Sequence, residues 1–263
     1  MDLGLRGARV LVTAASGGLG AATAKVFSQE GAIVVINSRS LDKLQATARE
    51  INSATGNAVF TYAADVSDPE SAKKVVDNAV SMLGGLDILI TNAGGPPAGT
   101  FEQFDYEDWR SATDLTLLSA VNLIKPALPH LKQSSRAAVL AVVSIAAKQP
   151  VENLTLSNTI RPAVVGLTKT LSLELGAENI RFNSILPGVT ETARVDKLMQ
   201  ARADKNNTDP ATEREKAAQS IPIKRLGDAM EFANAAVFLC SPAAGFINGT
   251  ALAVDGGATR TTF

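Results

Sequence analysis

Short apolar runs alternate with longer amphipathic segments along most of this chain. Runs rich in Val, Ile, Leu and Ala are typical of buried strands, and apolar residues at helical spacing are typical of helices packed on a sheet. We expect strands at residues 9–13, 32–37, 57–64, 86–91, 137–143, 180–186 and 251–254. We expect helices at residues 19–30, 40–55, 115–131, 157–175 and 231–239, and one that begins near residue 69. This alternation predicts an α/β fold: a Rossmann-type doubly wound parallel sheet of about seven strands, with helices on both faces.

Polar residues and prolines mark several helix boundaries. Ser40 and Asp68 stand where N-caps are expected, because a short side-chain oxygen can accept a hydrogen bond from an unpaired backbone N–H. Pro69 follows at the first helical position, where its missing N–H costs little. Pro126 and Pro129 fall inside one expected helix, and we expect them to kink or shorten it.

Composition and charge exclude several classes of protein. The 263 residues contain no long Pro-, Gly- or Ser-rich tract, so we expect a single domain over residues 1–263. The net charge of −1 offers no basic surface for nucleic acid or an anionic membrane. No apolar run reaches about 18 residues, so no membrane span is expected and the cytoplasm is the default compartment.

The one cysteine and the one histidine carry no predicted chemistry. Cys240 lies in an apolar helical run and is expected in the core. His130 lies at a helix end and is expected to be structural or exposed. No group of His, Asp and Glu residues has metal-ligand spacing, so we predict no metal site.

A glycine-rich turn follows the first expected strand. It reads Thr-Ala-Ala-Ser-Gly-Gly-Leu-Gly over residues 13–20. Such turns bind phosphate through backbone N–H groups at the start of the next helix. A tight strand-to-helix turn would explain the same glycines, so this motif alone leaves both interpretations open.

A second segment has the spacing of a family motif. Ser144 ends an expected strand, Ser157 follows thirteen residues later, and Arg161 follows after four more. This stretch resembles the active-site segment of the short-chain dehydrogenase/reductase family, which has serine, tyrosine and lysine at these positions. The turn at 13–20 resembles that family's Thr-Gly-x-x-x-Gly-x-Gly motif, with Ala14 in place of the first glycine. The resemblance covers nearly the whole chain, and in layout it is closest to the 3-oxoacyl-carrier-protein-reductase-like branch.

The resemblance implies a dinucleotide site at the carboxyl ends of the strands. The family places an aspartate against adenine, an Asn-Ala-Gly triplet beside the adenosine ribose, and a threonine on the nicotinamide amide. Asp65, residues 92–94 and Thr192 match these positions. The residues implied to bind cofactor are Thr13, Ser16, Gly18, Leu19, Gly20, Ser38, Arg39, Asp65, Val66, Asn92, Ala93, Gly94, Arg161, Pro187, Gly188 and Thr192.

The end of the second expected strand favours NADP(H) over NAD(H). An NAD site uses an acidic residue there to bind the ribose 2′-hydroxyl. The chain has Asn-Ser-Arg-Ser over residues 37–40, with no acid. Arg39 can pair with a 2′-phosphate and Ser38 can donate a hydrogen bond, although an exposed arginine at a helix start would have the same sequence.

The chemical positions depart from the family together. The resemblance implies that Ser144 polarises a carbonyl, but Ser157 replaces the tyrosine that donates the proton and Arg161 replaces the lysine. The family's asparagine on the preceding helix aligns with Thr116. An aliphatic hydroxyl is a poor acid, and a guanidinium does not release a proton at neutral pH. Lys148, water or the substrate itself could supply the proton instead.

Two functional hypotheses from different classes follow. The first is an NADP-dependent oxidoreductase that acts on a small carbonyl or alcohol substrate. The second is a catalytically silent NADP-binding protein, either a sensor or an assembly partner; a fold relic that binds no nucleotide is a third possibility. The resemblance also implies a homotetramer or homodimer and a mobile substrate lid at about residues 189–221.

Overall fold

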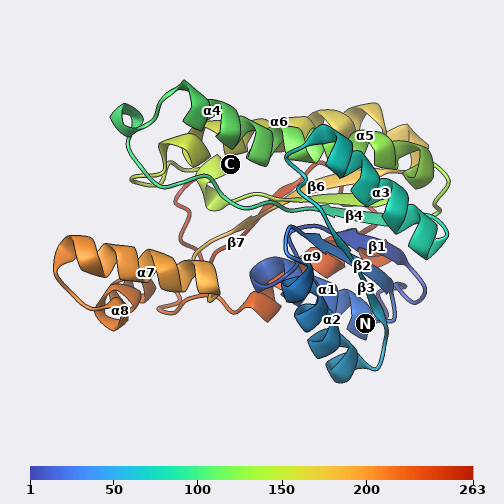
Figure 1. Ribbon diagram of the computed structural model, residues 1–263, viewed down its shortest axis with the longest axis horizontal. Helices are drawn as coiled ribbons and strands as arrows, with labels where there is room; N and C mark the ends of the chain where they lie inside the picture. Colours follow the sequence, from blue (N-terminus) through green and yellow to red (C-terminus); the bar gives the residue numbers. More distant parts are fainter. Residues whose placement is uncertain (263) are drawn as a thin grey trace.

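One parallel sheet organises the protein. The computed structural model describes residues 1–262, and within them seven strands form a sheet in the order β3-β2-β1-β4-β5-β6-β7 (Figure 1). The strands are β1 (Arg9–Val12), β2 (Ile33–Ser38), β3 (Val59–Ala63), β4 (Ile88–Thr91), β5 (Ala138–Val142), β6 (Arg181–Pro187) and β7 (Ala251–Val254). The α-helices are α1 (Gly18–Gln29), α2 (Leu41–Thr55), α3 (Pro69–Leu83), α4 (Tyr106–Thr113), α5 (Ser119–Leu131), α6 (Thr155–Glu174), α7 (Ala193–Asn206), α8 (Pro210–Ser220) and α9 (Ala229–Cys240).

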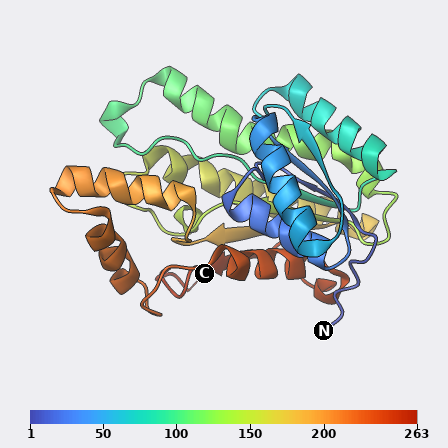
Figure 2. The ribbon, with the colours of Figure 1, turned by 60° about the horizontal axis from the view of Figure 1, so that its bottom comes forward.

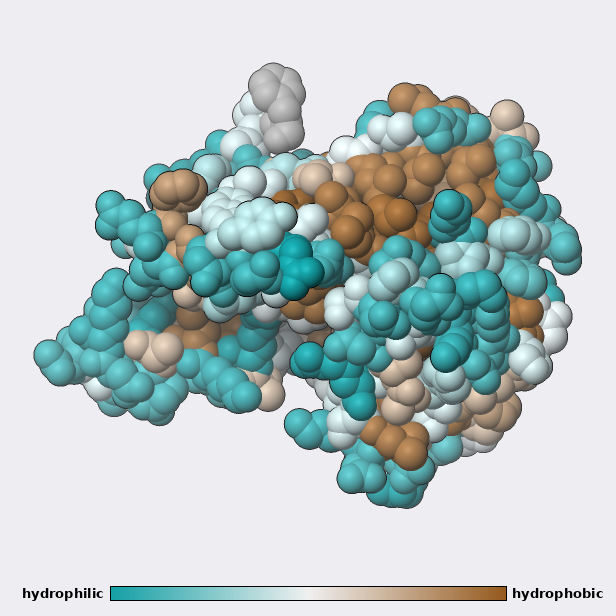
Figure 3. Space-filling model, turned by 45° about the horizontal axis from the view of Figure 1, so that its top comes forward, coloured by the Kyte–Doolittle hydropathy of each residue, from teal (hydrophilic) through white to brown (hydrophobic). Residues whose placement is uncertain are grey.

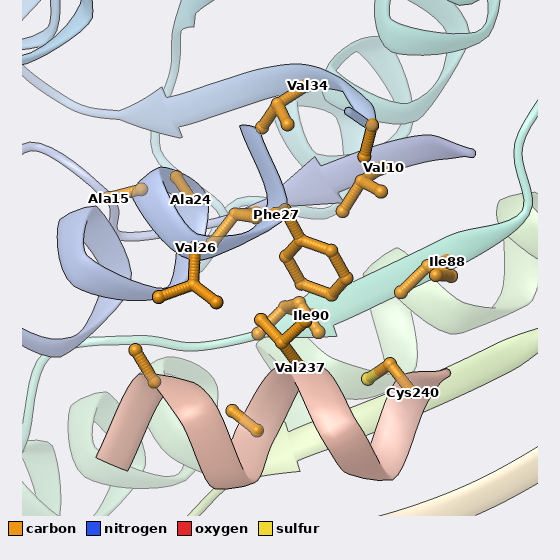
Figure 4. Close-up of a cluster of buried hydrophobic side chains, with 14 of the residues drawn as sticks. Val10, Ala15, Ala24, Val26, Phe27, Val34, Ile88, Ile90, Val237 and Cys240 are labelled. Carbon is orange, nitrogen blue, oxygen red and sulfur yellow. The ribbon is translucent and has the colours of Figure 1, made fainter. Parts of the chain in front are cut away.

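Helices cover both faces of the sheet, as the alternating pattern predicts. Val10 and Val12 of β1 face the core shared with α1, α2 and α9, whereas Leu11 faces the core shared with α3 and α5. Figure 4 shows Phe27 of α1 packed between the strands and Val237 of α9. Because the central strands β1, β4 and β5 are covered on both faces, they form almost continuous apolar runs.

Most predicted boundaries hold to within two or three residues. Ser40 caps α2 by accepting a hydrogen bond from the Lys43 N–H at 3.5 Å. Asp68 caps α3 by accepting one from the Ser71 N–H at 2.7 Å. Cys240 is buried, and burial raises the pKa of its thiol to about 12, so the core assignment is confirmed.

The two prolines that we expect to kink or shorten the helix at 115–131 do not end it. α5 contains both Pro126 and Pro129 and continues to Leu131. Its apolar side is buried against α3 and the sheet, which offsets the two missing backbone hydrogen bonds. The irregularity lies at the other end, where a π-helical turn, η2 (Asp114–Leu118), joins α5 to the unexpected helix α4.

The segment expected as a lid contains two helices. α7 and α8 pack on each other through an apolar cluster that includes Val195, Met199 and Ala217. Figures 1 and 2 show this pair projecting to one side of the main layers. It follows β6, so it leaves the sheet at the carboxyl edge of the strands.

Two expected absences concern membranes and metals. No helix within residues 1–262 is long and apolar enough to cross a bilayer. The same residues contain no group of three or more His, Cys, Asp or Glu side chains placed to hold a metal ion.

Candidate functional site at the carboxyl edge of the sheet

Thr13 ties the turn after β1 to the turn after β4. Its hydroxyl donates to the Asn92 carbonyl at 2.7 Å and accepts from the Asn92 N–H at 2.9 Å. The Asn92 amide reaches back to the Ala14 carbonyl at 3.5 Å. Thr13 is fully buried, so it positions the two turns and has no surface of its own for a ligand.

The glycine-rich turn requires its third glycine and strains its alanine. A Cβ on Gly20 would lie 2.5 Å from the Ala14 carbonyl oxygen, so only glycine fits there. Ala14 itself has φ of 48°, in the left-handed region that favours glycine. The alanine at position 14 therefore adds both a methyl group to the turn and the strain of a left-handed backbone conformation.

The first turn of α1 begins at an exposed glycine pair. Gly17 and Gly18 are exposed, and no acidic residue lies in this turn. Thr192, the N-cap of α7, lies above it: a Cβ on Gly18 would be 3.4 Å from the Thr192 methyl group. The segment that follows β6 therefore contacts the turn after β1, as a dinucleotide site that uses both segments requires.

The end of β2 presents Ser38 and Arg39. The Ser38 hydroxyl is buried and has no hydrogen-bond partner among residues 1–262. The Arg39 side chain is 79 % exposed and lies 3.9 Å from Asp65, whose carboxylate is held by the N–H and hydroxyl of Ser67. Because the Arg39 side chain is mostly exposed and its ion pair with Asp65 is long, a second anion could reach its guanidinium at this corner.

Ser144 keeps its hydroxyl proton available. It caps a short 3-10 turn, η3 (Ile145–Ala147), by accepting a hydrogen bond from the Ala146 N–H at 3.1 Å. The hydrogen bond from Ala146 therefore holds the Ser144 oxygen in place, and the O–H can donate to a ligand. Lys148 ends the same turn, is partly buried, and forms no ion pair within residues 1–262.

Ser157 stands at the position where the family has its tyrosine. It lies in the first turn of α6 and is only 3 % exposed. Its hydroxyl has no hydrogen-bond partner among residues 1–262. An aliphatic hydroxyl that no side chain activates is a poor acid.

Arg161 points inward from α6 to the edge of the sheet. Its Nη1 donates to the Val143 carbonyl at 2.5 Å, and its side chain helps to line a small cavity with Asn92, Gly94 and Thr116. Burial lowers the pKa of Arg161 to about 10, and the nearby charge of Arg194 acts in the same direction. The guanidinium is still charged at neutral pH.

Two buried hydroxyls share this cavity and lack partners. Thr91 at the end of β4 and Thr116 in η2 form no side-chain hydrogen bond among residues 1–262. A π-helical turn adds a residue to the helix and is often found at functional sites. Here it places Thr116 beside Arg161, at the position that the family alignment assigns to asparagine. Thr91 was not predicted from the sequence.

Arg194 is a second residue that the sequence did not reveal. It lies in the first turn of α7, and its guanidinium covers Gly95, the residue after the Asn-Ala-Gly triplet. A Cβ on Gly95 would lie 2.7 Å from Arg194 Cζ, so this approach depends on the glycine. No pattern of residue types in the sequence indicates this contact, because α7 and the end of β4 come together only when the chain folds.

Comparisons with known proteins agree with this fold. A family model described as enoyl-(acyl carrier protein) reductase matches residues 13–259. The chain belongs to the short-chain dehydrogenase/reductase family. It is 33 % identical over 259 residues to 7α-hydroxysteroid dehydrogenase of Escherichia coli K12, covering 98 % of this chain and 97 % of that protein.

Two solved structures of this family are similar over nearly the whole chain. L-Sorbose reductase from Gluconobacter frateurii, complexed with NADPH and L-sorbose, has a TM-score of 0.95 at 34 % identity, covering 99 % of this chain and 100 % of that one. An NADPH-bound short-chain oxidoreductase from Pseudomonas aeruginosa PAO1, described as containing an atypical catalytic center, has a TM-score of 0.88 at 28 % identity, covering 97 % and 98 %.

Proposed function

We propose that the protein is an NADP-dependent oxidoreductase that interconverts a small carbonyl compound and its alcohol at an atypical active site. Arg161 carries the proposal. Its buried guanidinium faces a cavity with two unpartnered hydroxyls, beside the Asn-Ala-Gly triplet. A buried cation with open donors needs a polar ligand. A ribose of a bound dinucleotide would supply its hydroxyls at this place.

The residues present fit NADP(H). The open first turn of α1 suits a pyrophosphate, and Thr192 lies above it. The buried, unpartnered hydroxyl of Ser38 and the exposed guanidinium of Arg39 suit a 2′-phosphate. These contacts support NADP(H) over NAD(H), and relatives bound to NADPH are consistent with that choice.

Carbonyl reduction at this site would use the cofactor, two side chains and a proton source. Bound NADPH would supply the hydride. Ser144 donates its hydroxyl proton in a hydrogen bond to the carbonyl oxygen and polarises it, because its own acceptor position is already used by Ala146. Arg161 adds positive charge next to the oxygen that becomes negative. The proton itself comes from water, from Lys148 or from the substrate, since neither Ser157 nor Arg161 is a suitable acid.

A silent NADP-binding protein is the second candidate, because the shielded Ser157 leaves the family's acid position without an acid. Two measurements separate the candidates: NADPH affinity by calorimetry, and NADPH oxidation across a panel of aldehydes, ketones and oxo acids. Turnover of any panel member supports the enzyme. NADPH binding at micromolar affinity without turnover of any panel member supports the silent protein, and an absence of NADPH binding contradicts both.

We also propose one domain over residues 1–263, with a substrate lid at about 189–221, that assembles as a homotetramer or homodimer. Leu118 and Leu173 are exposed on the α5–α6 side, and Figure 3 shows an apolar area on that face. Leu252 on the open edge strand β7 is 37 % exposed, and Phe246 near it is fully exposed. Exposed apolar areas of this kind mark contacts between subunits. Light scattering coupled to size exclusion gives the assembly mass.

A further inference from the structure

The cations around the proposed carbonyl position lack acidic partners. Arg161 comes from α6 and Arg194 from α7, and neither forms an ion pair within residues 1–262. The pKa of Arg161 is lowered by burial and by Arg194, and no carboxylate acts in the opposite direction. Two guanidinium groups that repel each other across a cleft, with no acid between them, make the cleft positive.

The acids that could neutralise Arg194 are occupied elsewhere. Glu191 and Asp196 flank it along the chain, and Arg214 of α8 binds both of them, Asp196 at 2.6 Å. Arg214 thereby fixes the start of α7 and keeps the Arg194 guanidinium free, above Gly95. An exposed arginine whose neighbouring acids are all paired is available for an anion that is not part of the protein.

We propose that the substrate is an oxo acid, with its carboxylate held by Arg194 and its carbonyl oxygen directed to Ser144. This inference rests on the proposed oxidoreductase function. In the reductive direction the carbonyl carbon would receive the hydride of NADPH, the carbon–oxygen π pair would move to oxygen, and that oxygen would take a proton from water, which leaves as hydroxide. The oxo acid becomes a hydroxy acid and NADPH becomes NADP⁺, so atoms and electrons balance.

The competing partner for Arg194 is the pyrophosphate of the cofactor. The geometry separates the two positions, because Thr192 covers Gly18 at the phosphate turn after β1. Arg194 lies two residues further along α7 and covers Gly95, which follows β4 next to Arg161. The Arg194 guanidinium also lies close enough to Arg161 for its charge to lower the pKa of Arg161, which places it on the Arg161 side of the cleft. NADPH affinity distinguishes the two roles directly.

The test compares Arg194→Gln with Lys197→Gln, which removes one charge from an exposed position of the same helix. Substrates are pyruvate and acetoacetate, each beside its methyl ester. We expect Arg194→Gln to lower kcat/KM for the acids about ten- to 100-fold, as for a lost charged hydrogen bond, with little change for the esters. Arg194→Lys should restore part of the lost kcat/KM for the acids. Lys197→Gln should leave kcat/KM unchanged for both the acids and the esters.

Two results would overturn the inference. One is an equal loss for acid and ester, and the other is a tenfold weaker NADPH affinity in Arg194→Gln, which would assign the residue to the cofactor. If no carbonyl is turned over, the proposed function fails, but the inference is still tested by titrating lactate and 3-hydroxybutyrate, and their methyl esters, into the NADPH-loaded protein. Binding of the acids that disappears in Arg194→Gln supports the anion site, and equal binding of acids and esters refutes it.

Discussion

The Arg161 guanidinium donates a hydrogen bond to the carbonyl oxygen of Val143, the residue directly before Ser144. This bond fixes the first half of α6 to the end of β5 and holds the arginine below the proposed nicotinamide ribose. Lysine could not make this contact and present further donors in one plane, because only the guanidinium has five N–H groups in a rigid fork. The arginine can therefore serve the fold and the cofactor together.

Removing the Arg161 guanidinium should weaken the cofactor complex. We expect Arg161→Ala to reduce NADPH affinity by about 1–3 kcal/mol, the value of a lost charged hydrogen bond. Calorimetric titration of the variant measures this loss, and a thermal unfolding scan checks that the fold survives. An NADPH affinity equal to that of the wild type would refute the role assigned to Arg161.

The two active-site serines should behave differently. Ser144 has a free O–H to donate, so Ser144→Ala should lower kcat about 100-fold, in the range of a lost oxyanion donor. Ser157 is shielded and chemically a poor acid, so Ser157→Ala should lower kcat by less than about threefold. Single-turnover rates with any substrate that the panel identifies compare the two. A large loss in Ser157→Ala would show that its hydroxyl takes part after all.

The 2′-phosphate assignment predicts a change of cofactor preference. Arg39→Asp places a carboxylate at the end of β2, where it repels a phosphate and can accept a hydrogen bond from a ribose 2′-hydroxyl. The ratio of NADPH to NADH affinity should fall at least tenfold. Arg49→Asp, an exposed arginine on α2, is the matched control and should leave the ratio unchanged. An unchanged ratio in Arg39→Asp would count against NADP(H).

The sequence predicts the sheet well and the chemical site poorly, for a physical reason. Buried parallel strands must be apolar on both faces, so β1, β4 and β5 can be recognised in the sequence as short runs rich in Val, Leu, Ile and Ala. The π-helical turn at Thr116 is a change of hydrogen-bond register, which no residue type specifies. Arg194 reaches Gly95 only because β6 and β4 lie in one sheet, and that contact spans about a hundred residues of chain.

Ala14 should be a stability defect that glycine repairs. A left-handed alanine costs about 1–2 kcal/mol, and glycine loses about 0.5–1 kcal/mol in chain entropy on folding. Ala14→Gly should therefore raise the free energy of unfolding by about 0.5–1 kcal/mol, as measured by urea denaturation. Ala46→Gly, in an exposed helical position of α2, should lower it by about 1 kcal/mol. Destabilisation by both changes would mean that the turn imposes no strain.

A partly buried ion pair at the opposite edge of the sheet should make stability depend on pH. Burial alone would raise the pKa of Asp87, but hydrogen bonds from Arg9 and Ser134 outweigh it, and the net pKa is lowered. A carboxylate with a lowered folded-state pKa stabilises the protein above its unfolded pKa near 3.9 and loses that contribution as the pH falls through the folded value.

Asp87→Asn should therefore lower the free energy of unfolding by about 1–3 kcal/mol at pH 7, because Arg9 loses its charged partner. The difference from the wild type should shrink as the pH falls below about 4, where the wild-type carboxylate becomes protonated as well. Urea denaturation of both proteins at pH 7, 5 and 3 measures it. Asp77→Asn, which breaks only the exposed pair with Lys73, should change the free energy of unfolding far less than Asp87→Asn at pH 7. A difference between Asp87→Asn and the wild type that stays constant from pH 7 to pH 3 would show that the Asp87 charge contributes nothing.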